Sequence, residues 1–221
     1  MANQDNKKAV VKGTTPAGIA IFPKLFEPDY KFDADGTYSV KLKIEAEAAQ
    51  TLIDQIEALT QEAFAEAESN CKNAREKAKL KYATPCYEAE MDEDGKETGY
   101  YLFRFKMKAS GISKKTGKPW SRKPAVFDAK GKPVINPDYQ VWSGSLLRVA
   151  YELSAFSTNI GVGCSCRLVA CQIIELSTGQ GQDASAFGFG EEDGFDSGMG
   201  DGESVRDSNP EVDGAAEEGD F

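Results

Sequence analysis

Apolar and polar residues alternate along several short stretches of the chain, a pattern that predicts β-strands with one buried face. In the stretch from 37 to 44, Tyr38, Val40, Leu42 and Ile44 alternate with polar or basic residues. Successive side chains of a strand point to opposite faces, so these four are expected to enter a core. The other face of this strand carries Lys41 and Lys43 and is expected to be cationic.

Two later stretches alternate in the same way. Between 100 and 109, Phe103, Phe105 and Met107 face one way and Arg104, Lys106 and Lys108 face the other. Between 146 and 156, the expected core face consists of Leu147, Val149, Tyr151 and Leu153. Residues 164–176 form a further apolar run, rich in β-branched and small residues, and are expected to be the last long strand.

A single long helix is expected from Glu45 to about Lys81, because this segment has no Pro or Gly and is rich in Ala and Glu. Its apolar residues recur at helical spacing: Leu52, Ile56, Leu59, Ala63, Ala67, Ala74 and Ala78. The stripe has large side chains at its start and Ala at its end. The first half is therefore expected to pack on the body, and the second half to project or to pack shallowly.

These elements predict a mainly β fold of five to seven strands with one long inserted helix. A small closed or partly closed β-barrel is the natural arrangement, because closure removes exposed sheet edges. A β-sandwich is the alternative that the pattern leaves open.

The distribution of charge changes this picture. Ten basic residues fall between 104 and 132, with Asp128 as the only acid: Arg104, Lys106, Lys108, Lys114, Lys115, Lys118, Arg122, Lys123, Lys130 and Lys132. Phe105, Trp120 and Phe127 are interleaved with them. Cations follow a phosphate backbone and aromatic rings stack on bases, so this stretch favours a single-stranded nucleic-acid groove. The alternative is a pair of ordinary strands joined by a solvated Lys-rich hairpin.

The C-terminal segment is strongly acidic. Residues 180–221 contain seven Asp and six Glu against one Arg, a net charge of −12, whereas the rest of the chain carries 25 Lys and Arg against 23 Asp and Glu. Gly, Asp, Glu, Ser and Ala dominate from Gly179 onward, which predicts a disordered tail. The division is thus a folded domain over 1–178 and a tail over 179–221. A terminal Phe221 after Glu217, Glu218 and Asp220 favours docking to a partner protein over the alternative of an inert, solubilising tail.

The composition argues against most catalytic and metal sites. There is no His in the chain, which removes the commonest acid–base residue and every Ser-His or Cys-His dyad. Cys164 and Cys166 share one face of a strand, but no C-x-x-C pair exists, so buried small side chains are expected rather than zinc ligands. No cofactor, metal or membrane span is expected, and the protein is expected to be cytoplasmic with reduced thiols.

Several segments, taken in order and with the tail after them, resemble the single-stranded DNA-binding protein family of T7-like podoviral bacteriophages. The segments extend over most of the chain: Gly36-Thr-Tyr-Ser-Val-Lys-Leu42, the helix 55–67, Phe103-Arg-Phe-Lys106, Asp128-Ala-Lys-Gly-Lys132, Tyr151-Glu-Leu153, 159–163, Ile174-Glu-Leu176 and the terminal Asp220-Phe221. Their order, more than any one of them, carries the resemblance.

The resemblance implies an OB-fold and sequence-independent binding of single-stranded DNA during phage replication and recombination, with protection and annealing of strands. It implies a homodimer in the cytoplasm of the infected bacterial host, and a tail that contacts the phage DNA polymerase and helicase-primase. It also implies a base-stacking aromatic in the turn after the Tyr151 strand, the place of Phe156. Non-catalytic DNA binding is thus the leading hypothesis.

The residues expected to bind DNA combine both arguments: Arg104, Lys106, Lys108, Lys114, Lys115, Lys118, Arg122 and Lys123 as cations, and Trp120 and Phe156 as stacking rings. The tail is expected to compete with DNA for this groove, because it is a tethered polyanion. Two alternatives remain: an RNA-binding or structural protein whose hairpin contacts a protein partner, and a carboxylate-dependent nuclease using Asp33, Asp35, Asp92 and Asp94.

Overall fold

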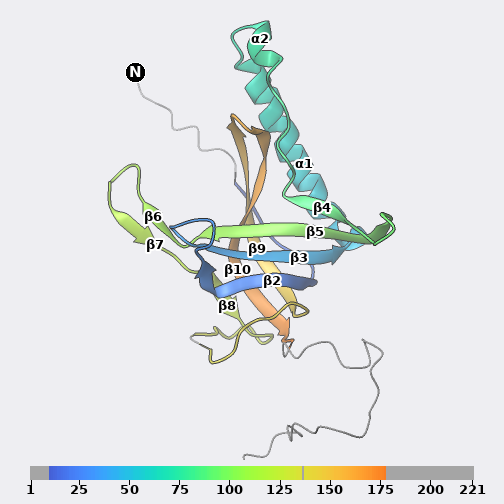
Figure 1. The fold of residues 1–221 in the computed structure, drawn as a ribbon, viewed down its shortest axis with the longest axis vertical. Coiled ribbons are helices and arrows are strands. Elements are labelled where there is room, and N and C mark those ends of the chain that lie inside the picture. Colours follow the sequence, from blue (N-terminus) through green and yellow to red (C-terminus); the bar gives the residue numbers. More distant parts are fainter. Residues whose placement is uncertain (1–9, 136, 178–221) are drawn as a thin grey trace, which may run out of the picture. The chain divides into compact units, whose positions relative to one another are not determined.

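The computed structural model describes residues 10–135 and 137–177, which contain ten strands and two helices joined by loops (Figure 1). The acidic tail with its expected docking residues, Glu217, Glu218, Asp220 and Phe221, lies outside the described residues. The strands are β1 (Val11–Thr14), β2 (Gly18–Asp29), β3 (Thr37–Glu45), β4 (Tyr87–Met91), β5 (Glu97–Lys108), β6 (Ser110–Ile112), β7 (Pro119–Ser121), β8 (Ala125–Phe127), β9 (Leu146–Thr158) and β10 (Gly161–Glu175).

The expected number of strands was too low, because short strands add to the long ones. β1 has four residues and β6 and β7 have three each, too few for an alternating pattern to be recognised. β1 is held by antiparallel pairing with β9, and β6 pairs only with β7 in a separate two-stranded sheet. Tertiary pairing rather than local pattern creates these elements.

Five of the long strands pair in a closed circuit. β2 pairs with β3, β3 with β5, β5 with β10, β10 with β9, and β9 again with β2 at Gly18 and Ile19. All these pairings are antiparallel except that of β5 with β10. A circuit of this kind leaves no free edge among the five strands, as in the small Greek-key barrels of OB-folds. The mainly β fold with an inserted helix is confirmed.

The buried faces of the strands are those that the alternation predicts. Phe103, Phe105, Leu42, Leu147 and Leu153 are all fully buried. The two phenyl rings lie 6.4 Å apart, and Phe105 lies 6.0 Å from the ring of Tyr151 across the interior. β3, β5 and β9 therefore form the core together with β10 and α1, and the charged faces of β3 and β5 are left on the outside.

The single helix expected to reach Lys81 is wrong in its second half. α1 (Ala46–Ser69) ends before Asn70, and a short α2 (Ala74–Lys77) begins after Asn73. The Asn73 side chain accepts a hydrogen bond from the Glu76 amide at 2.9 Å, which is the N-cap interaction that Asn favours. The preference of Asn for capping positions thus interrupts the helix between Ser69 and Ala74, although Ala and Glu on both sides favour helix.

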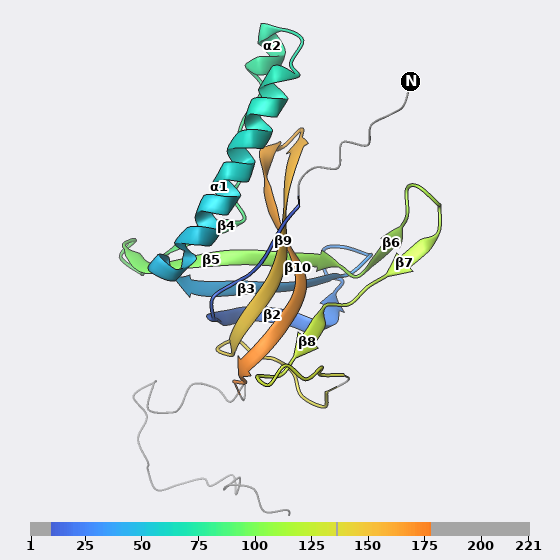
Figure 2. The same ribbon diagram turned by 180° about the vertical axis from the view of Figure 1, so that it is seen from behind.

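The packing of α1 agrees with its apolar stripe. Its buried residues all lie between Ala49 and Ala63, and the helix packs against β9 and β10. The C-terminal end of α1 projects past the strands together with α2 (Figures 1 and 2). Neither helix of the described residues is long and apolar enough to cross a membrane.

Candidate nucleic-acid interface

A groove of about 530 Å³ lies over β3, β5 and β10. Its lining comes from these strands, from the last residue of β2, from the loop between β2 and β3, and from the residue that follows β7. The lining residues are Asp29, Phe32, Asp33, Thr37, Ser39, Lys106, Met107, Lys108, Arg122, Ser165, Cys166 and Arg167. They include four cationic side chains and two carboxylates, so the groove has an excess of positive charge among its lining residues.

Strand register explains why the cations gather there. Lys106 on β5 pairs with Ser39 on β3 on one side and with Arg167 on β10 on the other. Lys108, two residues further along β5, pairs with Thr37. Residues that pair across neighbouring strands lie on the same face of a sheet. The polar row therefore crosses the outer face of three strands.

Lys106 is the least restrained of these cations. Its side chain is exposed, and no carboxylate of the described residues lies within 4.0 Å of its ammonium group. Arg167, by contrast, forms an ion pair with Glu152 on β9, which also pairs with Lys12 at 3.1 Å. Lys106 is thus available to a phosphate without first losing a protein partner.

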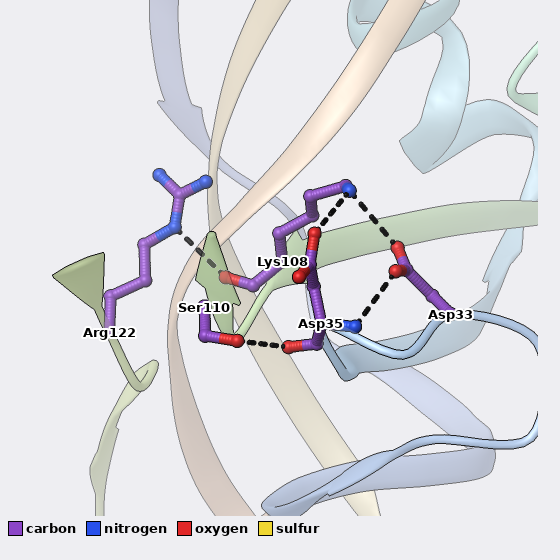
Figure 3. Close-up of polar contacts among 5 residues, drawn as sticks. All are labelled: Asp33, Asp35, Lys108, Ser110 and Arg122. Atoms are coloured by element: carbon purple, nitrogen blue, oxygen red, sulfur yellow. Dashed lines mark hydrogen bonds and ion pairs between the residues drawn. The ribbon is translucent and has the colours of Figure 1, made fainter. Parts of the chain in front are cut away.

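Lys108 is held by two acids at the end of the groove (Figure 3). Its ammonium nitrogen lies 3.2 Å from Asp33 Oδ2 and 3.2 Å from Asp35 Oδ2. These carboxylates raise the pKa of Lys108, the Asp35 hydrogen bond most. The pKa of Asp33 is lowered, first by the Asp35 backbone amide and then by Lys108. A phosphate at Lys108 must therefore compete with two carboxylates that already neutralise it.

Arg122 links the groove to the β6–β7 hairpin. Its Nε donates a hydrogen bond to the Lys108 carbonyl at 2.9 Å, and its guanidinium carbon lies 4.4 Å from the Trp120 ring centroid. Burial lowers the pKa of Arg122, and the nearby charge of Arg167 lowers it further. Two guanidinium groups thus lie close enough to repel each other, which favours an anion between them.

The Trp120 ring packs inside its hairpin. A side chain added at Gly111, its partner residue on β6, would meet the Trp120 ring at 2.8 Å. With Arg122 over the ring as well, Trp120 is half-buried, whereas Trp142 is 50% exposed. Trp142 is therefore the more exposed of the two tryptophans. Trp142 does not line the groove.

The hairpin carries the remaining lysines of the basic stretch. Lys114, Lys115 and Lys118 are exposed in the segment between β6 and β7. This turn is closed by the Ser113 amide, which donates to the Lys118 carbonyl at 2.9 Å. The hairpin extends from the end of β5 opposite to the start of α1 (Figure 2). These lysines thus extend the cationic surface without lining the groove itself.

Arg104 and Lys123 do not line the groove. Arg104 Nη2 donates to the Pro85 carbonyl at 2.6 Å, and its Nη1 lies 3.7 Å from Glu88. Lys123 Nζ lies 5.7 Å from the Phe26 ring centroid on β2. Both residues have partners within the protein, and their roles in DNA binding stay predictions.

Phe156 is placed differently from the expectation. It lies within β9, two residues before the end of that strand, and not in the turn that follows. It pairs with Gly163 on β10, and an added side chain at Gly163 would meet its ring at 3.0 Å. The strand is longer than its alternating pattern because the β9–β10 hairpin continues the pairing up to Thr158 and Gly161. Its stacking role stays a prediction.

Two groove residues were missed by the sequence reasoning. Phe32 is 88% exposed in the loop between β2 and β3, with Lys31 Nζ 5.4 Å from its ring. Arg167 is the only basic residue of β10. The signal for Phe32 was the Tyr30-Lys-Phe32 run, which has the same mixture of aromatic and basic residues as the main basic stretch. No local signal could place Arg167 beside Lys106.

Comparison with known proteins identifies the family. The family model described as the single-stranded DNA-binding protein of bacteriophage T7 matches residues 18–176. The chain is 32% identical over 166 residues to the single-stranded DNA-binding protein of Escherichia phage T7, covering 73% of this chain and 68% of that protein. It is 31% identical over 173 residues to the single-stranded DNA-binding protein of Enterobacteria phage T3, covering 72% of this chain and 74% of that protein.

Solved structures agree with this relationship. The crystal structure of gp2.5, a single-stranded DNA-binding protein encoded by bacteriophage T7, matches with a TM-score of 0.65 at 25% identity, over 80% of this chain and 98% of that one. The single-stranded DNA-binding protein of bacteriophage Enc34, in complex with single-stranded DNA, matches in fold with a TM-score of 0.52 at 13% identity. The match covers 80% of this chain and 99% of that one. The expectation of a binding protein rather than an enzyme agrees with these relatives. The chain belongs to the single-stranded DNA-binding protein family of bacteriophage T7.

Proposed function

We propose that this protein binds single-stranded DNA, without sequence preference, along the groove over β3, β5 and β10. The observation that carries this proposal is the row of Lys106 and Arg167 beside Arg122, with the exposed ring of Phe32 at the same groove. The faces of the second and third strands, with the loops beside them, are where OB-folds take up oligonucleotides. β3, β5 and the β2–β3 loop hold those positions here.

The chemistry of the groove supports binding of a flexible strand rather than reading of bases. Ammonium and guanidinium groups attract phosphates wherever these lie along the strand, and a phenyl ring stacks on any base. The affinity should fall as salt rises, because counterions are released on binding. The hairpin lysines, Lys114, Lys115 and Lys118, would contact the strand as it leaves the groove. Coating of separated strands in this way protects them and assists their annealing.

The acidic tail has two proposed roles, both argued from its charge. At −12, it is a tethered polyanion of opposite sign to the groove, so it competes with DNA until the strand displaces it. Once released, Phe221 with its neighbours Glu217, Glu218 and Asp220 would dock on the phage DNA polymerase and helicase-primase. We further propose that the protein acts as a homodimer in the cytoplasm of the infected bacterial host.

Titration of a short oligo-dT at several salt concentrations tests the groove. Lys106→Gln removes the unpaired cation, so it should weaken binding and reduce the salt slope by about 0.7, the share of one phosphate on a single strand. Lys96→Gln, at the exposed β4–β5 turn, makes the same change of charge at the other end of β5 and should bind as the unmodified protein does. Equal effects of the two variants would contradict the proposed site.

Two further titrations separate the other proposals. Oligo-rU in place of oligo-dT tests the alternative of an RNA-binding protein, and comparable affinities would favour it. A chain that stops at Gly179 should bind oligo-dT more tightly at low salt. An unchanged affinity would remove the competition between tail and DNA but leave the groove proposal intact.

A further inference from the structure

A pair of thiols, Cys166 in the lining of the groove and Cys86 next to it, is not among the cations and rings assigned to DNA binding. The Sγ atoms of Cys86 and Cys166 are 2.9 Å apart, although the two residues are 80 positions apart in the chain. Both are free thiols, Cys86 half-buried and Cys166 buried. The prediction that Cys164 and Cys166 are buried small side chains is confirmed, but it did not include this contact.

The contact follows from the way two strands share one edge of β5. β4 pairs with β5 as far as Tyr87, opposite Phe103, and β10 takes over this edge with Cys166, opposite Phe105. Between them, the Cys86 carbonyl accepts a hydrogen bond from the Arg104 amide at 2.9 Å. Backbone pairing thus holds both cysteines at the junction of the two strands, so the short contact does not depend on a mobile loop.

We propose that Cys86 and Cys166 form a reversible intramolecular disulfide when the protein meets a small disulfide oxidant such as oxidised glutathione. A disulfide bond is about 2.05 Å long, so the two sulfur atoms need to approach by only about 0.9 Å from their 2.9 Å separation. In a reducing compartment such a bond is transient, which suits a modification that reports oxidation rather than a structural cross-link.

The environments of the two thiols assign their order of reaction. The hydrogen bond from Cys166 lowers the pKa of Cys86, and the Arg104 charge contributes in the same direction. Cys86 is also the more accessible of the pair. Cysteines that react first combine partial exposure with a nearby positive charge. Cys86 is therefore the attacking thiol and Cys166 the resolving thiol.

The steps balance as an ordinary thiol–disulfide exchange. The Cys86 thiolate attacks one sulfur of oxidised glutathione, forms a mixed disulfide and releases one glutathione thiolate. That thiolate takes the proton of Cys166, whose sulfur attacks Cys86 Sγ and releases the second glutathione. The two protein thiols lose two electrons and two protons, and one oxidised glutathione becomes two reduced molecules.

The test is to treat the native full-length protein with oxidised glutathione, alkylate the remaining thiols and map the products by mass spectrometry. The five thiols should fall to three, with a linked Cys86–Cys166 peptide that dithiothreitol removes. Cys71→Ser should lose two thiols in the same way, because Cys71 donates to the Ala67 carbonyl and contacts no other described thiol. Cys86→Ser should form no linked peptide.

Three results would overturn the proposal: a protein that keeps all five thiols, glutathione adducts without a linked peptide, or a link that maps to Cys164 or Cys171. Thermal melts of the two Ser variants show that each is folded before oxidation. Because the linked peptide is detected without DNA, this test is independent of the proposed function.

Discussion

Replacement of Asp33 and Asp35 by Asn should increase the affinity for single-stranded DNA. Both carboxylates lie 3.2 Å from the Lys108 ammonium group, at the end of the proposed groove. Asn keeps an oxygen at the place where Asp33 Oδ1 accepts the Asp35 amide, so the turn is retained. The substitution therefore releases Lys108 and removes two negative charges beside the path of the DNA.

The expected magnitude follows from counterion release. One additional phosphate contact steepens the salt dependence for a single strand by about 0.7 in the logarithmic slope. For a fourfold decrease in salt, from about 200 to about 50 mM, the variant should therefore gain about 2.5-fold in affinity beyond the gain of the unmodified protein. The loss of two repelling charges adds to the affinity at every salt concentration.

The chain offers a closely matched control for this variant. Asp92-Glu-Asp94-Gly95 repeats the Asp33-Ala-Asp35-Gly36 pattern, and Asp92 Oδ1 accepts the Asp94 amide at 3.0 Å as Asp33 Oδ1 accepts that of Asp35. Asp92→Asn with Asp94→Asn changes the net charge equally, but these acids form no ion pair within the described residues. Titration of a fluorescent oligo-dT compares the two. Equal slopes for both double variants would refute the reasoning.

Stacking, core packing and charge each have a measurable consequence. Phe32→Ala should weaken oligo-dT binding by about 1–3 kcal/mol without changing the slope of log affinity against log salt. A variant whose affinity changed only through a smaller salt slope would contradict a stacking role for Phe32. Phe105→Ala should lower the free energy of unfolding by about 3–5 kcal/mol in urea denaturation, because its ring is fully buried. Affinity should stay constant between about pH 6 and pH 8, because the chain has no His, and because the lowered pKa of Asp33 and the raised pKa of Lys108 keep this pair charged there. The pKa of Asp33 is lowered in the folded protein, so its ion pair with Lys108 contributes fully to stability above pH 3.8, the ordinary pKa of Asp. This contribution to stability is lost as the pH falls below 3.8.

The sequence predicts the part of the fold that local alternation encodes. Residues with a period of two in β3, β5 and β9 are buried as expected, since one face of each strand packs in the barrel. The end of α1 was misplaced because helix propensity continues beyond Ser69, while Asn70 and Asn73 end and begin helices through capping contacts. Alternation repeats over many residues and is visible as a periodic pattern, whereas a cap depends on a single residue and leaves no such pattern.

The candidate site was predictable in its charge but not in its geometry. Lys106 and Lys108 belong to a basic strand face that alternation shows, but their neighbours are set by the register of non-local pairs. The parallel pairing of β5 with β10 brings Arg167 beside Lys106, although 61 positions separate them in the chain. Arg104, on the same strand as Lys106, binds Pro85 and Glu88 outside the groove. Lys106 and Arg104 carry the same charge, but only Lys106 is free to contact a phosphate in the groove.

Ultraviolet cross-linking of oligo-dT, with the attached peptides mapped by mass spectrometry, tests the location of the bound strand most directly. The account predicts cross-links on the peptide that contains Phe32 and on those from β5, β7 and β10 that line the groove or adjoin it. It predicts none on Trp142, which is exposed outside the groove and serves as an internal control. Cross-links concentrated on Trp142, with Phe32 unmodified, would contradict the proposed path of the DNA.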